Sequence, residues 1–390
     1  MVMGRSSSPN PRWLSQHIEL IYEAKNIKTL RLSIPKLGCD AFRTILYSLQ
    51  EENKHLEELW IDGDSIDIGI AAALVSFLRL NTKLRVLRLS NTCITGNGSI
   101  AIFDSLKENH SLKELHLENN EIGPYAINSL ASMLRCNTKL GVLHIKNNPI
   151  GSEGTVMIAE ALRRNTHLEE LCLQQGSIGP RCLDSIGRML LRNRSLKNLL
   201  LVHTELGSEE IVGICSYAEH NTTLQRLVIT GSHVDSNAAH SIFSLLAKTK
   251  SLRMLYLWGN NLNDNGAAII TKGFTSNMSL RDIRLMMNCI SDTGAIALVG
   301  AFKQHYLLQD LDLSEDTITD TGGEAIVVAL KENVQVDNFF GFFGRSLVST
   351  KNNITLYKPL TRIQRLVYPH SYLPTPRLLS PTDTAFSYPQ

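Results

Sequence analysis

The sequence lacks the features of a membrane protein, of a secreted precursor and of a disulfide scaffold. No apolar run approaches the roughly 18 residues of a membrane-spanning helix, and the Ser-, Pro- and Arg-containing start has no apolar stretch. The seven cysteines are an odd number at wide spacings, without CxxC or zinc-ligand spacing. We therefore expect reduced thiols, a cytoplasmic location, no membrane segment and no bound metal.

An excess of one charge and the common catalytic motifs are also lacking. Lys and Arg total 39 against 37 Asp and Glu, a net charge of +2 over 390 residues, whereas phosphate binding needs concentrated positive charge. No GxxxxGK[ST], HExxH, GxSxG or GxGxxG motif is present. The sequence therefore predicts a non-enzymatic protein with no cofactor, no nucleic-acid partner and no small-molecule substrate.

What the sequence does contain is a repeat of 28 residues. Its first position is always leucine, at Leu56, Leu84, Leu112, Leu140, Leu168, Leu196, Leu224, Leu252, Leu280 and Leu308. Counting from this leucine, positions 4, 6, 11 and 19 are aliphatic in all ten copies. Five aliphatic columns at one period indicate a solenoid of similar units.

Each repeat is predicted to contain a strand followed by a helix. Positions 4 and 6 alternate with polar or variable neighbours, the pattern of a strand buried on one face, and positions 15 to 25 have helical spacing. Position 26 is usually Asn, where we expect the helix to end in a left-handed cap. Strands lie about 4.8 Å apart and helices roughly 8–10 Å apart, so the stack curves with its parallel strands inside. The predicted shape is a horseshoe.

The pattern LxxLxLxxN, as in Leu112 to Asn120, resembles the leucine-rich repeat family. The repeat length and helical half are similar to its ribonuclease-inhibitor-like class, which includes the C-terminal repeats of NOD-like receptors. This resemblance implies an α/β leucine-rich repeat solenoid, with a parallel β-sheet on the concave face and helices on the convex face. Position 9 departs from it, because only Asn120, Asn148, Asn260 and Asn288 keep the family's asparagine.

Three segments are predicted along the chain. Residues 1–26 form an N-terminal arm or cap, and residues 27–344 form the repeat domain with degenerate copies at both ends. Residues 345–390 hold six of the twelve prolines and six Lys or Arg against one acid, Asp383. This composition predicts a basic, partly disordered tail.

Function is predicted to lie on the concave face, which positions 3, 5 and 7 of each strand should line. Apolar residues gather there near the middle of the solenoid and are flanked by two arginines. They are Leu200, Val202, Val228, Met254, Tyr256, Trp258, Met286 and Met287, with Arg226 and Arg284 beside them. Exposed aromatic and Met side chains beside charge are typical of protein-binding hot spots. Alternatively, these residues stack on one another, or the basic tail folds over them.

Two histidines at position 5 of adjacent strands, His116 and His144, should lie side by side. They could bind a metal or sense pH, but without a third ligand two surface histidines are the simpler interpretation. The hypothesis for the whole chain is a scaffold that binds a protein or peptide, in innate-immune or other intracellular signalling. The alternatives are a GTPase-activating protein resembling the Ran activator, although the tail here is basic, and a ribonuclease inhibitor, although this chain is neither Cys-rich nor acidic.

Overall fold

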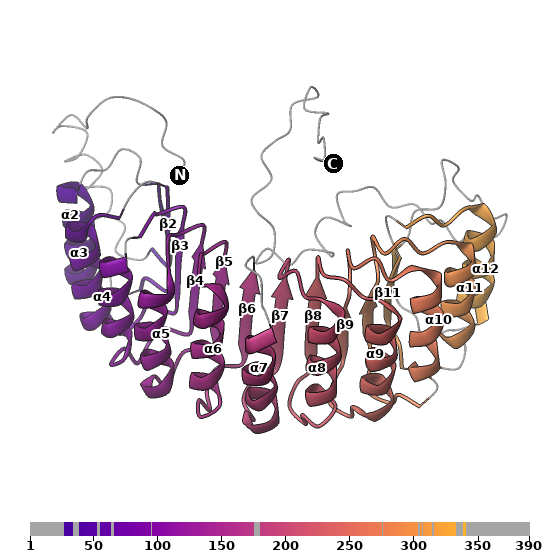
Figure 1. Cartoon of the computed structure of the whole chain (residues 1–390). Helices are drawn as coiled ribbons and strands as arrows, with labels where there is room; N and C mark the ends of the chain where they lie inside the picture. Colours follow the sequence, from indigo (N-terminus) through magenta and orange to yellow (C-terminus); the bar gives the residue numbers. More distant parts are fainter. Residues whose placement is uncertain are drawn as a thin grey trace, which may run out of the picture.

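The computed structural model describes residues 27–33, 39–52, 55–63, 66–94, 96–174, 180–274, 276–302, 305, 307–313, 316–332 and 338–340. Within these ranges, strands and helices alternate along the whole solenoid (Figure 1). The predicted N-terminal arm, residues 1–26, and the predicted tail, residues 345–390, lie outside the described residues. Both therefore remain predictions.

The strands form one parallel sheet in sequence order, from β1 to β12. They are β1 (Thr29–Ser33), β2 (Glu58–Asp62), β3 (Val86–Ser90), β4 (Glu114–Glu118), β5 (Val142–Lys146), β6 (Glu170–Gln174), β7 (Asn198–Val202), β8 (Arg226–Thr230), β9 (Met254–Tyr256), β10 (Asp282–Arg284), β11 (Asp310–Asp312) and β12 (Asn338–Phe340). The helices are α2 (Cys39–Glu52), α3 (Ile68–Leu80), α4 (Gly96–Leu106), α5 (Pro124–Cys136), α6 (Gly151–Leu162), α7 (Pro180–Arg192), α8 (Ser208–Ala218), α9 (Ser236–Lys248), α10 (Asn263–Phe274), α11 (Asp292–Phe302) and α12 (Asp320–Glu332).

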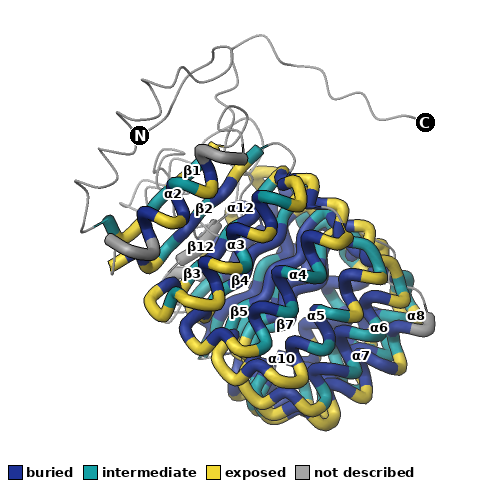
Figure 2. The backbone as a smooth tube through the Cα atoms, turned by 90° about the vertical axis from the view of Figure 1, so that its left-hand side faces the viewer, coloured by how far each residue is buried: buried dark blue, intermediate teal, exposed yellow. Residues whose placement is uncertain are grey.

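Strands and helices form two layers of one curved ribbon, so the predicted fold is confirmed (Figure 1). From β2 onward, every paired residue has its partner 28 positions later, as Leu87 has with Leu115. The aliphatic columns fill the space between the layers, and the helices alternate between buried and exposed along their length (Figure 2). A single repeat cannot bury its apolar face alone, so stacking supplies the core.

The asparagines at position 26 end the helices, but not in the predicted left-handed conformation. Asn81 and Asn137 are extended, with φ of −77° and −69°. Asn193 shows what the side chain does: its Nδ2 donates to the Leu162 carbonyl at 2.7 Å, and its Oδ1 accepts from the Leu196 N–H at 2.7 Å. The amide thus joins the helix end of the repeat before it to the strand entry of the repeat after it. Asparagine recurs at position 26 because its side chain supplies both a donor and an acceptor, and not because it tolerates a positive φ.

Left-handed residues lie instead after the strand, chiefly at position 8, with others at positions 10 and 12. Asn91, Asn119 and Asn147 have φ of 54°, 50° and 51°, as suits a residue type that tolerates this conformation. Met287 occupies the same position with φ of 56°, although its side chain offers no compensating local hydrogen bond. The chain turns sharply here to leave the sheet.

A second asparagine ladder runs through position 9. Asn288 is fully buried; its Nδ2 donates to the Leu257 carbonyl at 2.7 Å, and its Oδ1 accepts from the Asn260 N–H at 3.1 Å. In the next repeat the position is held by Asp316. Its Oδ1 accepts from the Asn288 N–H at 2.7 Å, while its Oδ2 is buried without a partner among the described residues. Burial raises the pKa of this carboxyl to about 7.

Near the C-terminal end, one repeat caps the helix of the next. The Asp264 carboxylate accepts from the Ser291 N–H at 2.7 Å, from its hydroxyl, and from the Gly294 N–H at 3.1 Å. These are free donors at the start of α11, which a carboxylate satisfies. None of the helices in the described part of the chain is long and apolar enough to cross a bilayer.

Candidate functional site

The concave face is built by side chains that point away from the helices. Strand register aligns position 5 of successive repeats, so that Leu200 lies beside Val228 and Val228 beside Tyr256. The sequence predicted this column, and parallel pairing produces it. Neighbouring side chains are separated by only the strand spacing, about 4.8 Å, so they pack against each other.

We use the name central patch for the ten residues predicted to bind a partner. They are Leu200, Val202, Arg226, Val228, Met254, Tyr256, Trp258, Arg284, Met286 and Met287. They come from β7, β8, β9 and β10 and from the residues directly after β9 and β10. The structure therefore brings all ten into one region of the sheet.

The central patch is more buried than the sequence predicted. Leu200, Val228 and Met286 are only 3%, 4% and 8% exposed. Leu200 and Val228 form a small apolar cluster with Cys172, and Val202 and Tyr256 pack against it. The expectation of exposure was wrong for Leu200, Val228 and Met286. Leu200 and Val228 are covered by their neighbours on the inner side of the closely spaced sheet.

Tyr256 is half-buried and fixed by three charged neighbours. Its hydroxyl donates to Asp282 Oδ2 at 2.5 Å, and the guanidinium carbons of Arg284 and Arg226 lie 4.5 and 6.0 Å from the ring centroid. Burial, and then the nearby Asp282 carboxylate, raise the pKa of the Tyr256 phenol, so it stays a donor. Arg284 also pairs with Asp282 at 3.4 Å. The two arginines thus hold the aromatic ring as well as flanking it.

The accessible part of the central patch comprises Met254 at the start of β9, the edge of Tyr256, and Trp258 and Met287 just after the strands. Met287 is 46% exposed, and Trp258 is half-buried with its ring edge-on to His203, 5.6 Å between centroids. Met254 is half-buried, with its Sδ 3.1 Å from Arg226 Nε. A ligand approaching the concave face would meet these side chains and the edge of Tyr256.

A second aromatic site, absent from the predicted residues, lies near the N-terminal end. Trp60 on β2 is half-buried, with the guanidinium carbons of Arg31 and Arg88 at 3.6 and 4.8 Å from its ring centroid. Such cation–π contacts hold the rings and the cations in place. Register alone places these three residues side by side, because Arg31 aligns with Trp60 and Trp60 with Arg88.

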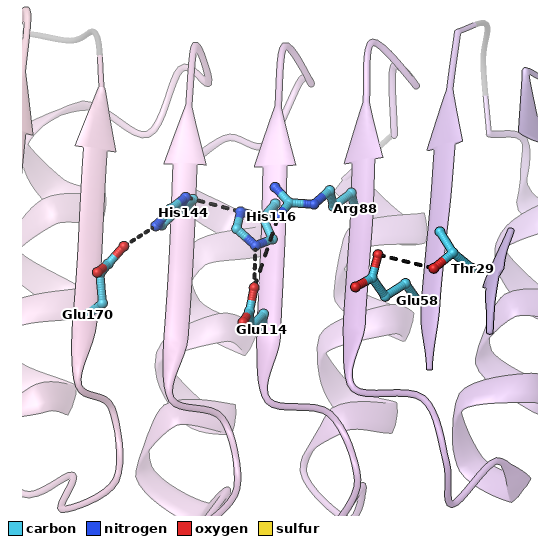
Figure 3. A network of polar contacts seen from close by, with 7 residues as sticks. All are labelled: Thr29, Glu58, Arg88, Glu114, His116, His144 and Glu170. Carbon is cyan, nitrogen blue, oxygen red and sulfur yellow. Dashed lines mark hydrogen bonds and ion pairs between the residues drawn. The ribbon is translucent and has the colours of Figure 1, made fainter. Parts of the chain in front are cut away.

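His116 and His144 form a polar network with Glu114 and Glu170, which we call the histidine network (Figure 3). The two Nδ1 atoms are 3.0 Å apart; His116 Nε2 is 3.2 Å from Glu114 Oε2, and His144 Nε2 is 2.7 Å from Glu170 Oε1. The histidines are only 6% and 2% exposed, so the interpretation as two surface histidines was wrong. The described residues contain no group of three or more His, Cys, Asp or Glu that could hold a metal ion.

Burial and hydrogen bonding act against each other in this network. Burial lowers the pKa of His116 to about 4, although the hydrogen bond to Glu114 favours the charged ring. Burial also lowers the pKa of His144, again against a hydrogen bond, here to Glu170. The hydrogen bond from His116 lowers the pKa of Glu114, so this carboxylate is ionised at neutral pH.

A family model and one solved structure agree with the repeat and the fold. A family model described as Leucine Rich repeat matches residues 80–103, 108–125, 136–159 and 276–299. A chain in the crystal structure of the Rad7 and Elc1 complex in yeast matches with a TM-score of 0.54 and 16% sequence identity, over 83% of this chain and 78% of that chain. The actin-binding site 2 of leiomodin-1 gives a TM-score of 0.30 and 25% identity, over 33% of this chain and 75% of that chain. No curated protein sequence matches.

Together, the repeat and the strand–helix units give the chain a leucine-rich repeat fold, and the family model matches four of its segments. Its fold is similar to that of the matching chain in the Rad7–Elc1 crystal structure.

Proposed function

We propose that this protein is a non-enzymatic scaffold that binds a protein or peptide on its concave face, over the accessible part of the central patch. The observation that carries the proposal is the grouping of Met254, Tyr256, Trp258 and Met287, partly exposed and bounded by Arg226 and Arg284. Aromatic, Met and Arg side chains are enriched where protein partners bind.

Preorganisation supports this role. Tyr256 is held by Asp282 and Arg284, and Trp258 rests against His203, so these side chains lose little freedom when a partner arrives. The likeness in fold to a protein crystallised with a protein partner, Rad7 with Elc1, is further support. A role in intracellular signalling, as in NOD-like receptors, is part of the proposal.

The proposal can be tested with peptides selected for binding to the wild-type protein. The affinity of each selected peptide is then measured for Trp258→Ala, for Met287→Ser and for Tyr125→Ala. Tyr125 is the matched control, because it is 88% exposed but lies on α5, on the convex side. We expect Trp258→Ala to weaken binding by about 30-fold, or roughly 2 kcal/mol, and Tyr125→Ala to leave it unchanged.

Equal affinity of the wild type and both patch variants would refute the site. The alternative function, GTPase activation, is tested by GTP hydrolysis assays with a panel of small GTPases. Acceleration of hydrolysis by the protein would refute a purely non-enzymatic scaffold.

A further inference from the structure

The histidine network has more hydrogen-bond contacts than two neutral histidines can supply with hydrogens. It contains three contacts at hydrogen-bond distance: Glu114 with His116, His116 with His144, and His144 with Glu170. Each contact requires one hydrogen between its two heavy atoms, because otherwise two lone pairs face each other. Two neutral imidazoles and two ionised carboxylates carry only two such hydrogens. The arrangement is therefore one hydrogen short unless the four groups bind an additional proton.

Charged and polar side chains from the neighbouring strands surround the network. On β3, Arg88 lies 4.0 Å from Glu114, and on β4 and β5 the other charged residues facing this region are Glu118 and Lys146. On β6 the residue beside His144 is Cys172, a buried thiol whose pKa burial raises to about 12. On β7, Asn198 Nδ2 donates to Glu170 Oε2 at 2.9 Å, which leaves Oε1 for His144. None of these contacts lies between the two Nδ1 atoms.

We propose that the histidine network holds three hydrogens at neutral pH, carries one negative charge instead of two, and releases its extra proton as the pH rises. It is thus a proton-sensitive element built into the concave face. The proton has two places to reside: between the imidazoles, as an imidazolium flanked by two carboxylates, or on Glu170, which then donates to His144. The hydrogen count is the same in both.

The burial of the two histidines bears on where the proton resides. The low pKa of both buried histidines opposes an imidazolium, and the ionised Glu114 is already the acceptor from His116. A metal ion between the two Nδ1 atoms would satisfy the same lone pairs. The absence of a third ligand among the described residues, and the cations Arg88 and Lys146 nearby, disfavour that occupant.

Glu170→Gln provides a direct test. The Gln oxygen can still accept from Asn198, and its amide can donate to His144, so the third hydrogen becomes a permanent part of the side chain. The matched control is Glu169→Gln, which removes the same charge from the neighbouring exposed residue that pairs with Lys197. The free energy of unfolding is measured by urea denaturation between pH 7 and pH 9 for all three proteins.

The sign follows from proton linkage. Above pH 7 the unfolded chain has released the protons of its His and Glu side chains, so the native network holds about one proton more. Wild-type and Glu169→Gln stability should therefore fall with rising pH by this one-proton component, which Glu170→Gln should lack. Parallel pH profiles for wild type and Glu170→Gln would overturn the proposal.

A second measurement does not depend on a variant that folds. In wild-type protein labelled with ¹⁵N-histidine and ¹³C-glutamate, NMR shifts report the protonation of all four side chains at pH 7. We expect one of them to carry the extra proton. Two neutral histidines with two ionised glutamates would overturn the proposal, as would zinc binding to the wild type that His144→Gln abolishes.

Discussion

Replacing Asp316 by asparagine should stabilise the protein at neutral and alkaline pH. In the preceding repeat, Asn288 uses its Nδ2 as a donor to a strand carbonyl and its Oδ1 as an acceptor. Asp316 keeps the acceptor, toward the Asn288 and Ile290 N–H groups, but its buried Oδ2 cannot donate once the carboxyl ionises. Asparagine restores a donor at this atom without adding a charge.

The size of the effect follows from the pKa. Burial raises the pKa of Asp316 from an ordinary 3.8 to about 7. At 1.36 kcal/mol per pH unit this difference corresponds to roughly 4 kcal/mol, and solvent screening of this partly exposed side chain reduces it to about 1–2 kcal/mol. Because the native pKa is the higher one, the native state holds the proton more tightly than the unfolded chain. The stability that the Asp316 proton contributes is therefore fully present below about pH 4, and it is lost as the pH rises toward 7.

Urea unfolding at pH 5 and at pH 8 tests this reasoning. We expect Asp316→Asn to exceed the wild type by about 1–2 kcal/mol at pH 8 and by clearly less at pH 5. Asp320→Asn is the control: it removes the same charge from the exposed first turn of α12, where a carboxylate is stabilising, and should cost about 0.3–1 kcal/mol. A gain that is equal at both pH values, or no gain at pH 8, would refute the assignment of a raised pKa.

Three further predictions concern stability, each measured by urea unfolding. Met287→Asn should gain about 1 kcal/mol, because Asn tolerates φ of 56° better than Met, whereas Met278→Asn, at an exposed site without positive φ, should gain nothing. Asn193→Ala should lower the free energy of unfolding by roughly 2–4 kcal/mol, because buried hydrogen bonds are lost. The control Asn97→Ala, at an exposed position, should change it little. Equal losses in the two variants would contradict the joining role of the Asn193 amide. Asp264→Ala should cost about 1–2 kcal/mol by uncapping α11, and unchanged stability would exclude capping across repeats.

The architecture could be predicted from the sequence because one apolar pattern is repeated ten times without an insertion. Leu59 and Leu87 show why: each column residue meets its own equivalent in the next repeat, so one local rule determines every contact along the sheet. The polar columns were harder to interpret. Asparagine at position 26 suggested a positive φ. Instead, the nitrogen and the oxygen of the Asn193 side-chain amide both form hydrogen bonds.

The candidate site was only partly predictable. The column from Leu200 to Tyr256 follows from register, but the exposure of each side chain depends on the size and rotamer of both neighbours, which periodicity does not report. The proximity of His116 and His144 was predicted from register, whereas their burial and their hydrogen bonds to Glu114 and Glu170 were not. The signal for the left-handed position was present as Asn and Gly at position 8, but it is interrupted by Gln175, His203, Met287 and Glu315.

The position 9 ladder gives the solenoid a polarity with consequences for shortened variants. Each asparagine there serves the repeat before it: Asn120 accepts from the Thr92 N–H at 3.0 Å and donates to the Leu89 carbonyl at 2.9 Å. Removing repeats from the C-terminal side would leave backbone N–H and carbonyl groups of the last repeat without the asparagine amide that pairs with them. Within this ladder, trimming from the other side leaves only an asparagine side chain without its partner, and water can solvate it. Elsewhere it also removes acceptors of backbone N–H groups, such as Asp264 for those at the start of α11. A C-terminal truncation should therefore keep a position 9 side chain beyond the last strand that it retains.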